Sequence, residues 1–133
     1  MAKIPPKPDG YSSVSPYLMV TDARQVIVFL KRVFEATELR QYLNPDGSIL
    51  HAEARIDDTV IMLADAQGKF PAFPAWMHVY VPDVDDTYRR ALEAGGESVQ
   101  EPELKDGDTD RRGGVKDPSG NTWWIATQVR EEA

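Results

Sequence analysis

The alternation of apolar and polar positions predicts one strand, one helix and three further strands in the first half of the chain. The strands are expected at residues 15–20, 39–43, 49–56 and 59–65. Between the first two, apolar residues recur at i, i+3, i+4, i+7 and i+8, which gives a helix one apolar face. These residues are Val26, Phe29, Leu30, Val33 and Phe34. Asp22 is a suitable N-cap for this helix.

The second half of the chain repeats this order of elements. Val20-Thr-Asp22 and Val81-Pro-Asp83 each begin a predicted helix, and they lie 61 positions apart. Val60–Ala64 and Thr122–Ala126 each end a half, 62 positions apart. Offsets that agree to within one residue indicate two copies of one supersecondary unit. The second copy is expected to contain strands at 76–81, 97–100, 113–116 and 122–129, a helix at 83–94, a charged loop at 101–110 and a turn at 117–121.

These elements predict an α+β fold in which two βαβββ modules form an open cup. The 133 residues suit a single domain. Residues 1–12, which include three prolines, are expected to form an extended arm, and residues 13–130 the domain. Within it we expect module one at about 13–66, a connector at 67–74 and module two at about 75–130.

Period-two alternation divides each strand into two faces. The aliphatic set, such as Met77 and Val79, is expected under the helices, and in residues 49–56 this set includes Leu50. The opposite set is aromatic and thioether-rich with scattered polar atoms, a composition typical of a small-molecule pocket. It includes Tyr17, Met62, Trp76, His78, Tyr80, Trp124 and Gln128.

Composition and charge narrow the classes of partner. The chain has no cysteine, which excludes disulfides and thiolate metal sites. Its net charge of -7 disfavours nucleic-acid binding, which depends on neutralising phosphates. No apolar run approaches the ~20 residues of a membrane span, and the first ten residues hold no apolar stretch of signal-peptide length. We therefore expect a cytoplasmic protein with no nucleic-acid or membrane partner.

The twofold pattern and several motifs resemble the vicinal oxygen chelate superfamily, which contains glyoxalase I, extradiol dioxygenases, and fosfomycin- and bleomycin-resistance proteins. The motifs are VTDA, HAEARI, IMLAD, HVYVPDVDD, ALEAGG and GGVKDPSGNTWWIAT. The chain is most similar to the PhnB-like group, over residues 13–129. The resemblance implies the paired-module fold and a homodimer in which modules from two chains complete each pocket. It does not imply one reaction, because this scaffold serves many chemistries.

Metal-using members of that superfamily hold a divalent ion with His and Glu from both modules. The resemblance places these four positions at Ser15, Met62, Trp76 and Trp124. A hydroxyl, a thioether and two indoles do not make a tight oxygen and imidazole site. The expectation is therefore a protein without a metal cofactor.

The two histidines leave an alternative open. His51 and Glu53 are expected on the cup side of residues 49–56, and His78 on the cup side of residues 76–81. A displaced divalent-metal site at His51 and His78, or His78 as a general base, would make the protein an enzyme of the glyoxalase, lyase or dioxygenase type. Otherwise His51 pairs with a neighbouring carboxylate and His78 hydrogen-bonds within the pocket.

The leading prediction is a metal-independent binder of the bleomycin-resistance type that sequesters a hydrophobic or cationic small molecule. Trp76, Tyr80 and Trp124 would contact its apolar surface, and His78 and Gln128 would supply polar contacts. The same aromatic residues could instead fill the cavity and pack a dimer interface. Arg112, with Arg111, could hold an anionic group, although the acidic loop beside them favours ion pairs. The predicted ligand-binding set is Tyr17, His51, Met62, Trp76, His78, Tyr80, Arg112, Trp124 and Gln128.

Overall fold

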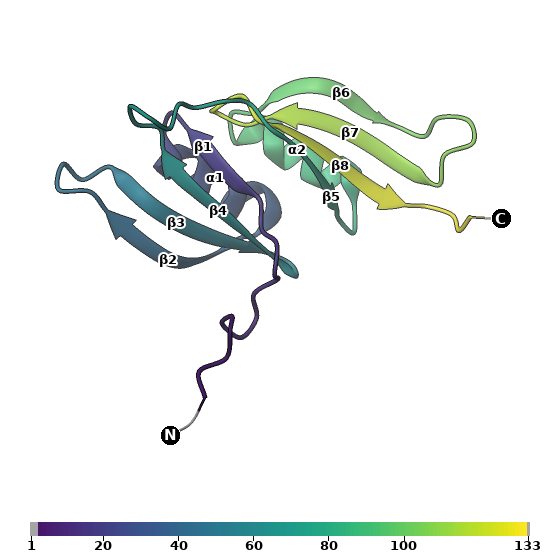
Figure 1. Ribbon diagram of the computed structural model, residues 1–133. Coiled ribbons are helices and arrows are strands. Elements are labelled where there is room, and N and C mark those ends of the chain that lie inside the picture. The colour runs from purple at the N-terminus through teal and green to yellow at the C-terminus, as the bar shows by residue number, and fades with distance from the viewer. Residues whose placement is uncertain (1–2, 133) are drawn as a thin grey trace.

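The computed structural model describes residues 3–132, which form two four-stranded mixed sheets with two helices packed behind them (Figure 1). Module one contains β1 (Tyr17–Val20), α1 (Ala23–Phe34), β2 (Thr37–Leu43), β3 (Ile49–Ile56) and β4 (Thr59–Asp65). Module two contains β5 (Trp76–Tyr80), α2 (Val84–Glu93), β6 (Glu97–Glu103), β7 (Asp110–Lys116) and β8 (Thr122–Gln128). The predicted α+β fold with two βαβββ modules is confirmed. No helix among residues 3–132 is long and apolar enough to cross a membrane.

The two sheets have the same strand order, β1-β4-β3-β2 and β5-β8-β7-β6. The pairs β1–β4 and β5–β8 are parallel, and the other pairs are antiparallel. In module one, Met62 lies between Tyr17 and Glu53 across the strands. In module two, Trp124 lies between His78 and Gly114. The internal repeat therefore places equivalent residues at equivalent points of the two sheets.

A continuous core joins the two modules. The helix face predicted from spacing is confirmed, because Val26, Leu30 and Val33 are fully buried. The Asp22 carboxylate accepts a hydrogen bond from the Gln25 N–H, as expected of an N-cap. Across the modules, the rings of Phe34 and Trp123 lie 5.2 Å apart. Figure 1 shows both helices on the same side of the sheets, which leaves the opposite side of each sheet open.

Two expectations about the strands are wrong in detail. The predicted loop at 101–110 is shorter, because β6 continues to Glu103 and β7 begins at Asp110. Pro102 is tolerated there because it lies in an edge strand at a register shift, where no ladder hydrogen bond is required. Leu50 is 54% exposed rather than buried. A register shift beside Leu43 gives the buried position to Ile49 instead.

Candidate functional site

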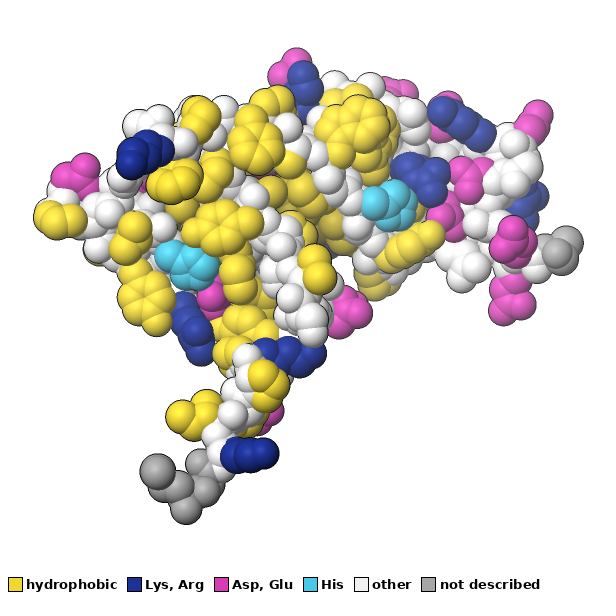
Figure 2. All heavy atoms as spheres, in the orientation of Figure 1, with side chains coloured by type: hydrophobic (Ala, Val, Ile, Leu, Met, Phe, Trp, Pro, Cys, Tyr) yellow, Lys and Arg dark blue, Asp and Glu magenta, His cyan; other side chains and the backbone are white. Residues whose placement is uncertain are grey.

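The sides of the two sheets that the helices leave open carry a set of large side chains, which we call the aromatic face. Its members are Tyr17, Met62, Trp76, His78, Tyr80 and Trp124. Trp76 is 74% exposed, Tyr80 62% and Tyr17 44%. Hydrophobic side chains and histidines gather on this side of the molecule (Figure 2). A contiguous exposed apolar surface of this kind is typical of a ligand or protein interface.

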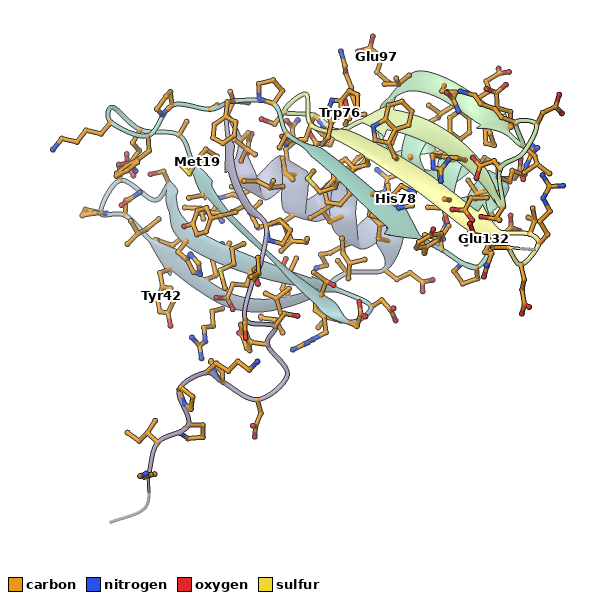
Figure 3. All side chains as sticks on the ribbon, turned by 45° about the vertical axis from the view of Figure 1, so that its right-hand side comes forward. Met19, Tyr42, Trp76, His78, Glu97 and Glu132 are labelled. Carbon is orange, nitrogen blue, oxygen red and sulfur yellow. The ribbon has the colours of Figure 1, made fainter. Side chains whose placement is uncertain are left out.

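Two tryptophans form the centre of the module two half. Trp76 packs edge-on against Trp124, with 5.4 Å between ring centroids, and Figure 3 shows Trp76 and His78 projecting from β5. The Trp124 ring lies close against β7 because Gly114 has no side chain: a Cβ there would be 2.7 Å from the indole. Trp124 also borders a hollow of about 170 Å³ with Asp108 and Arg112. The glycine therefore allows the indole to lie this close to β7.

We expect the substitution Gly114→Ala to displace the Trp124 ring and to lower the free energy of unfolding by about 1–3 kcal/mol, the usual cost of overpacking. The same substitution should cost much less in a Trp124→Ala background, because the three atoms nearest to the added methyl all belong to the indole. Urea unfolding of the four proteins in this cycle measures the difference. An equal penalty in both backgrounds would show that the added methyl acts elsewhere.

Arg112 organises the polar groups of module two. Its Nε donates to Nε2 of His78 over 3.1 Å, and its two terminal nitrogens donate to Asp108 over 2.8 Å and Asp110 over 3.0 Å. The Tyr80 hydroxyl also donates to Asp110, over 2.7 Å. Arg111 makes two hydrogen bonds to Asp85. Both arginines thus form ion pairs within the chain.

This arrangement sets the protonation of His78. Burial, and then the positive charge of Arg112, lower the pKa of His78, so the ring is neutral at neutral pH. Since Nε2 accepts the hydrogen bond from Arg112, the ring proton lies on Nδ1. The Nδ1–H is therefore the hydrogen-bond donor of the His78 ring.

The polar groups of module one form a second network. The Tyr17 hydroxyl lies 2.9 Å from Nδ1 of His51, and Nε2 of His51 lies 2.8 Å from Glu53. Glu53 is only 3% exposed, because Tyr11 from the N-terminal arm covers it and donates to its other oxygen. Arg55 fixes the arm through a 2.6 Å hydrogen bond to the Gly10 carbonyl. The end of the predicted arm is therefore docked on the sheet.

The donor set does not fit a metal ion. Ser15, Met62, Trp76 and Trp124, the four positions expected from the resemblance, supply neither imidazole nor carboxylate. His51 and Glu53 lie together, whereas His78 belongs to the Arg112 network of the other module. Within residues 3–132, no group of three or more His, Cys, Asp or Glu is placed to hold a metal. The alternative site at His51 and His78 is thus not assembled within one chain.

Gln128 and Tyr80, both predicted to bind the ligand, line the same cleft. Gln128 is exposed at the end of β8, and the cleft, of about 960 Å³, lies between the two modules. Tyr80 forms the shared rim of this cleft and the aromatic face. This cleft is therefore beside the aromatic face, not on it.

Sequence reasoning missed Tyr11, Asp108, Asp110 and Gly114 as members of these networks. One of the four could have been found, because Asp110 and Arg112 are two residues apart in β7, so their side chains share a face. Tyr11 contacts Glu53 from 42 positions away, and no local pattern indicates such a contact.

Comparison with known proteins identifies the class. A family model described as "Glyoxalase/Bleomycin resistance protein/Dioxygenase superfamily" matches residues 12–125. The chain therefore belongs to this superfamily. The uncharacterized protein Rv0887c of Mycobacterium tuberculosis (strain ATCC 25618 / H37Rv) is 37% identical over 132 residues, which covers 90% of this chain and 76% of that protein.

Solved structures share the same architecture. TioX from Micromonospora sp. ML1 superimposes with a TM-score of 0.74 at 24% identity, and the match covers 89% of this chain and 99% of TioX. A PhnB protein from Bacillus cereus gives a TM-score of 0.69 at 15% identity, covering 87% of this chain and 99% of that one. At these identities the likeness establishes the fold alone.

Proposed function

We propose that this protein binds a small aromatic molecule, hydrophobic or cationic, in a pocket that needs no metal ion. The observation that carries this proposal is Trp76, which is 74% exposed and supported edge-on by Trp124. Large indole surfaces held in fixed positions are what a planar ligand stacks on. Membership of a superfamily that contains bleomycin-resistance proteins supports the same conclusion.

The charge of the protein favours a cationic ligand over an anionic one. The net charge is -7, and the field of an acidic protein attracts cations. Indole rings attract cations through their π-electrons, most strongly where water is excluded. Arg112 is already occupied by two carboxylates and His78, so it is poorly suited to hold an anionic ligand.

We propose further that two copies of the chain complete each pocket. In a twofold dimer, the same surfaces meet twice, so module one of one protomer can face module two of its partner. Tyr17, Trp76 and Tyr80 are exposed in the single chain, and a second copy on the aromatic face would bury them.

A thermal-shift screen against aromatic drugs, with neutral and cationic members, tests the binding. A ligand at about 100 times its Kd should stabilise the protein by about 2.7 kcal/mol. Trp76→Leu should remove this stabilisation, whereas Phe70→Leu, which changes an exposed ring outside both sheets, should keep it. Elemental analysis tests the enzyme alternative. A stoichiometric metal that is present in the unmodified protein and lost in His51→Ala would favour this alternative.

A further inference from the structure

Four hydrogen-bonded side chains cross the module one half of the aromatic face in a fixed direction. An ionised Glu53 only accepts hydrogen bonds, so the His51 proton must lie on Nε2, which is 2.8 Å away. With this single proton on the ring, Nδ1 of His51 accepts a hydrogen bond from the Tyr17 hydroxyl at 2.9 Å. Tyr11 donates to the remaining oxygen of Glu53. The network therefore leaves the Tyr17 oxygen with unused lone pairs on a partly exposed side chain.

The surroundings keep each group in the required state. Burial opposes ionisation of Glu53, but hydrogen bonds from Tyr11 and His51 outweigh it and hold the pKa of this carboxyl below its usual value. Arg40 acts in the same direction. Burial, and then the Glu53 charge, raise the pKa of Tyr17, so its hydroxyl is protonated at neutral pH. Arg55 and Arg40 both lie near Tyr11 and complete the set of charged groups around the network.

We propose that Tyr17, His51 and Glu53 form a proton relay through which the Tyr17 oxygen takes a proton from an acidic hydroxyl, such as a phenol, on the bound ligand. This inference rests on the proposed function, since the ligand must occupy the aromatic face. The arrangement follows the logic of a serine–histidine–carboxylate triad, with a tyrosine hydroxyl in place of the serine. Tyr17 would touch the ligand, and His51 and Glu53 would be positioning residues.

The proton transfer balances without another reactant. The ligand O–H bond breaks, and its proton joins the Tyr17 oxygen as the original Tyr17 proton moves to Nδ1 of His51. The products are a ligand anion, a neutral tyrosine and an imidazolium that donates to the Glu53 carboxylate. The buried carboxylate stabilises this imidazolium, which is the role of the acid in such triads.

Module two shows that the relay is specific to module one. Tyr17 and His51 correspond to His78 and Arg112 at the repeat offset of 61 positions. The equivalent hydrogen bond exists, 3.1 Å long, but Arg112 is the donor. A guanidinium does not give up its proton in proteins, so that pair cannot take one from a ligand. Equivalent positions in the two modules thus hold a hydrogen-bonded pair that can accept a proton, Tyr17 and His51, and a pair that cannot, His78 and Arg112.

Binding of 4-nitrophenol in a buffer on the acidic side of its pKa tests the relay, because the nitrophenolate ion has its own visible absorption band. Quenching of tryptophan fluorescence reports binding separately. With the unmodified protein we expect the bound phenol to ionise with an apparent pKa lowered by about one unit, a tenfold change in the ratio of ion to phenol. Tyr17→Phe and His51→Gln should bind the phenol but lose the band. Tyr42→Phe should keep it, since this ring lies 6.2 Å from the His51 ring without hydrogen-bonding to it.

The outcomes separate the two proposals. Quenching with no nitrophenolate band would overturn the relay and leave the aromatic ligand site standing. Absence of quenching would contradict both, because the relay needs a ligand on this face. A band retained in Tyr17→Phe would also overturn the relay, whatever the binding. Nitrogen chemical shifts of His51 give an independent reading, since proton transfer from bound nitrophenol should place a proton on Nδ1.

Discussion

Replacing Trp76 with arginine is expected to convert the proposed dimer into monomers and to remove the ligand site. Trp76 is the most exposed aromatic residue on the aromatic face, so a partner protomer or ligand that covers this face must cover it. An unpaired charge in such an interface must lose its water, which costs several kcal/mol. The dimer dissociation constant should rise by about 100-fold or more. Sedimentation velocity across a range of protein concentrations measures this change.

The matched control is Phe70→Arg in the segment between the modules. Phe70 is 63% exposed, similar to Trp76, but belongs to neither sheet. The Phe70→Arg substitution should leave the sedimentation profile unchanged. It therefore distinguishes the general effect of replacing an exposed aromatic ring from the specific effect of disrupting the aromatic face. An unmodified protein that stays monomeric at all concentrations would contradict the dimer, as would a Trp76→Arg protein that remains dimeric.

The helices and strands were predictable because buried apolar residues recur in the sequence with the period of the helix or strand that contains them. Helical spacing from Val26 to Val33 and alternation in Trp76–Tyr80 each report which face meets the core. The repeat offset then indicated which residue of module two is equivalent to each residue of module one. Prediction failed at irregularities of the ladder, as at Leu50, because a single register shift reverses which residues face inward.

The candidate site was only partly predictable, for a related reason. Alternation placed His51 and Glu53 on one face, yet it could not indicate that Tyr11 would cover the carboxylate. Nor could it show that Arg112 would donate to His78, 34 positions away. These long-range hydrogen bonds decide which ring nitrogen carries a proton. The chemistry of the face therefore depends on contacts that sequence periodicity does not record.

The turn at residues 117–121 illustrates the same limit, because it does more than reverse the chain. The Asp117 carboxylate is buried and accepts hydrogen bonds from the Ser119 N–H, from Asn121 and from the indole of the fully buried Trp123, the last over 2.9 Å. The turn also reaches outside its own hairpin. Ser119 Oγ accepts from the Thr21 N–H in module one, over 3.1 Å. One carboxylate thus organises a junction between the modules.

We therefore expect Asp117→Ala to lower the free energy of unfolding by about 3–5 kcal/mol, since it leaves several buried donors without an acceptor. Asp46→Ala is the matched control: its carboxylate also accepts hydrogen bonds within a turn, from Ser48, but it is exposed, so water replaces it at little cost. Urea unfolding followed by circular dichroism compares the two. Equal losses would mean that Asp117 acts only as a turn residue. A larger loss for Asp117, together with altered tryptophan fluorescence, would establish that the turn anchors Trp123 and, through it, the sheet that carries Trp76 and Trp124.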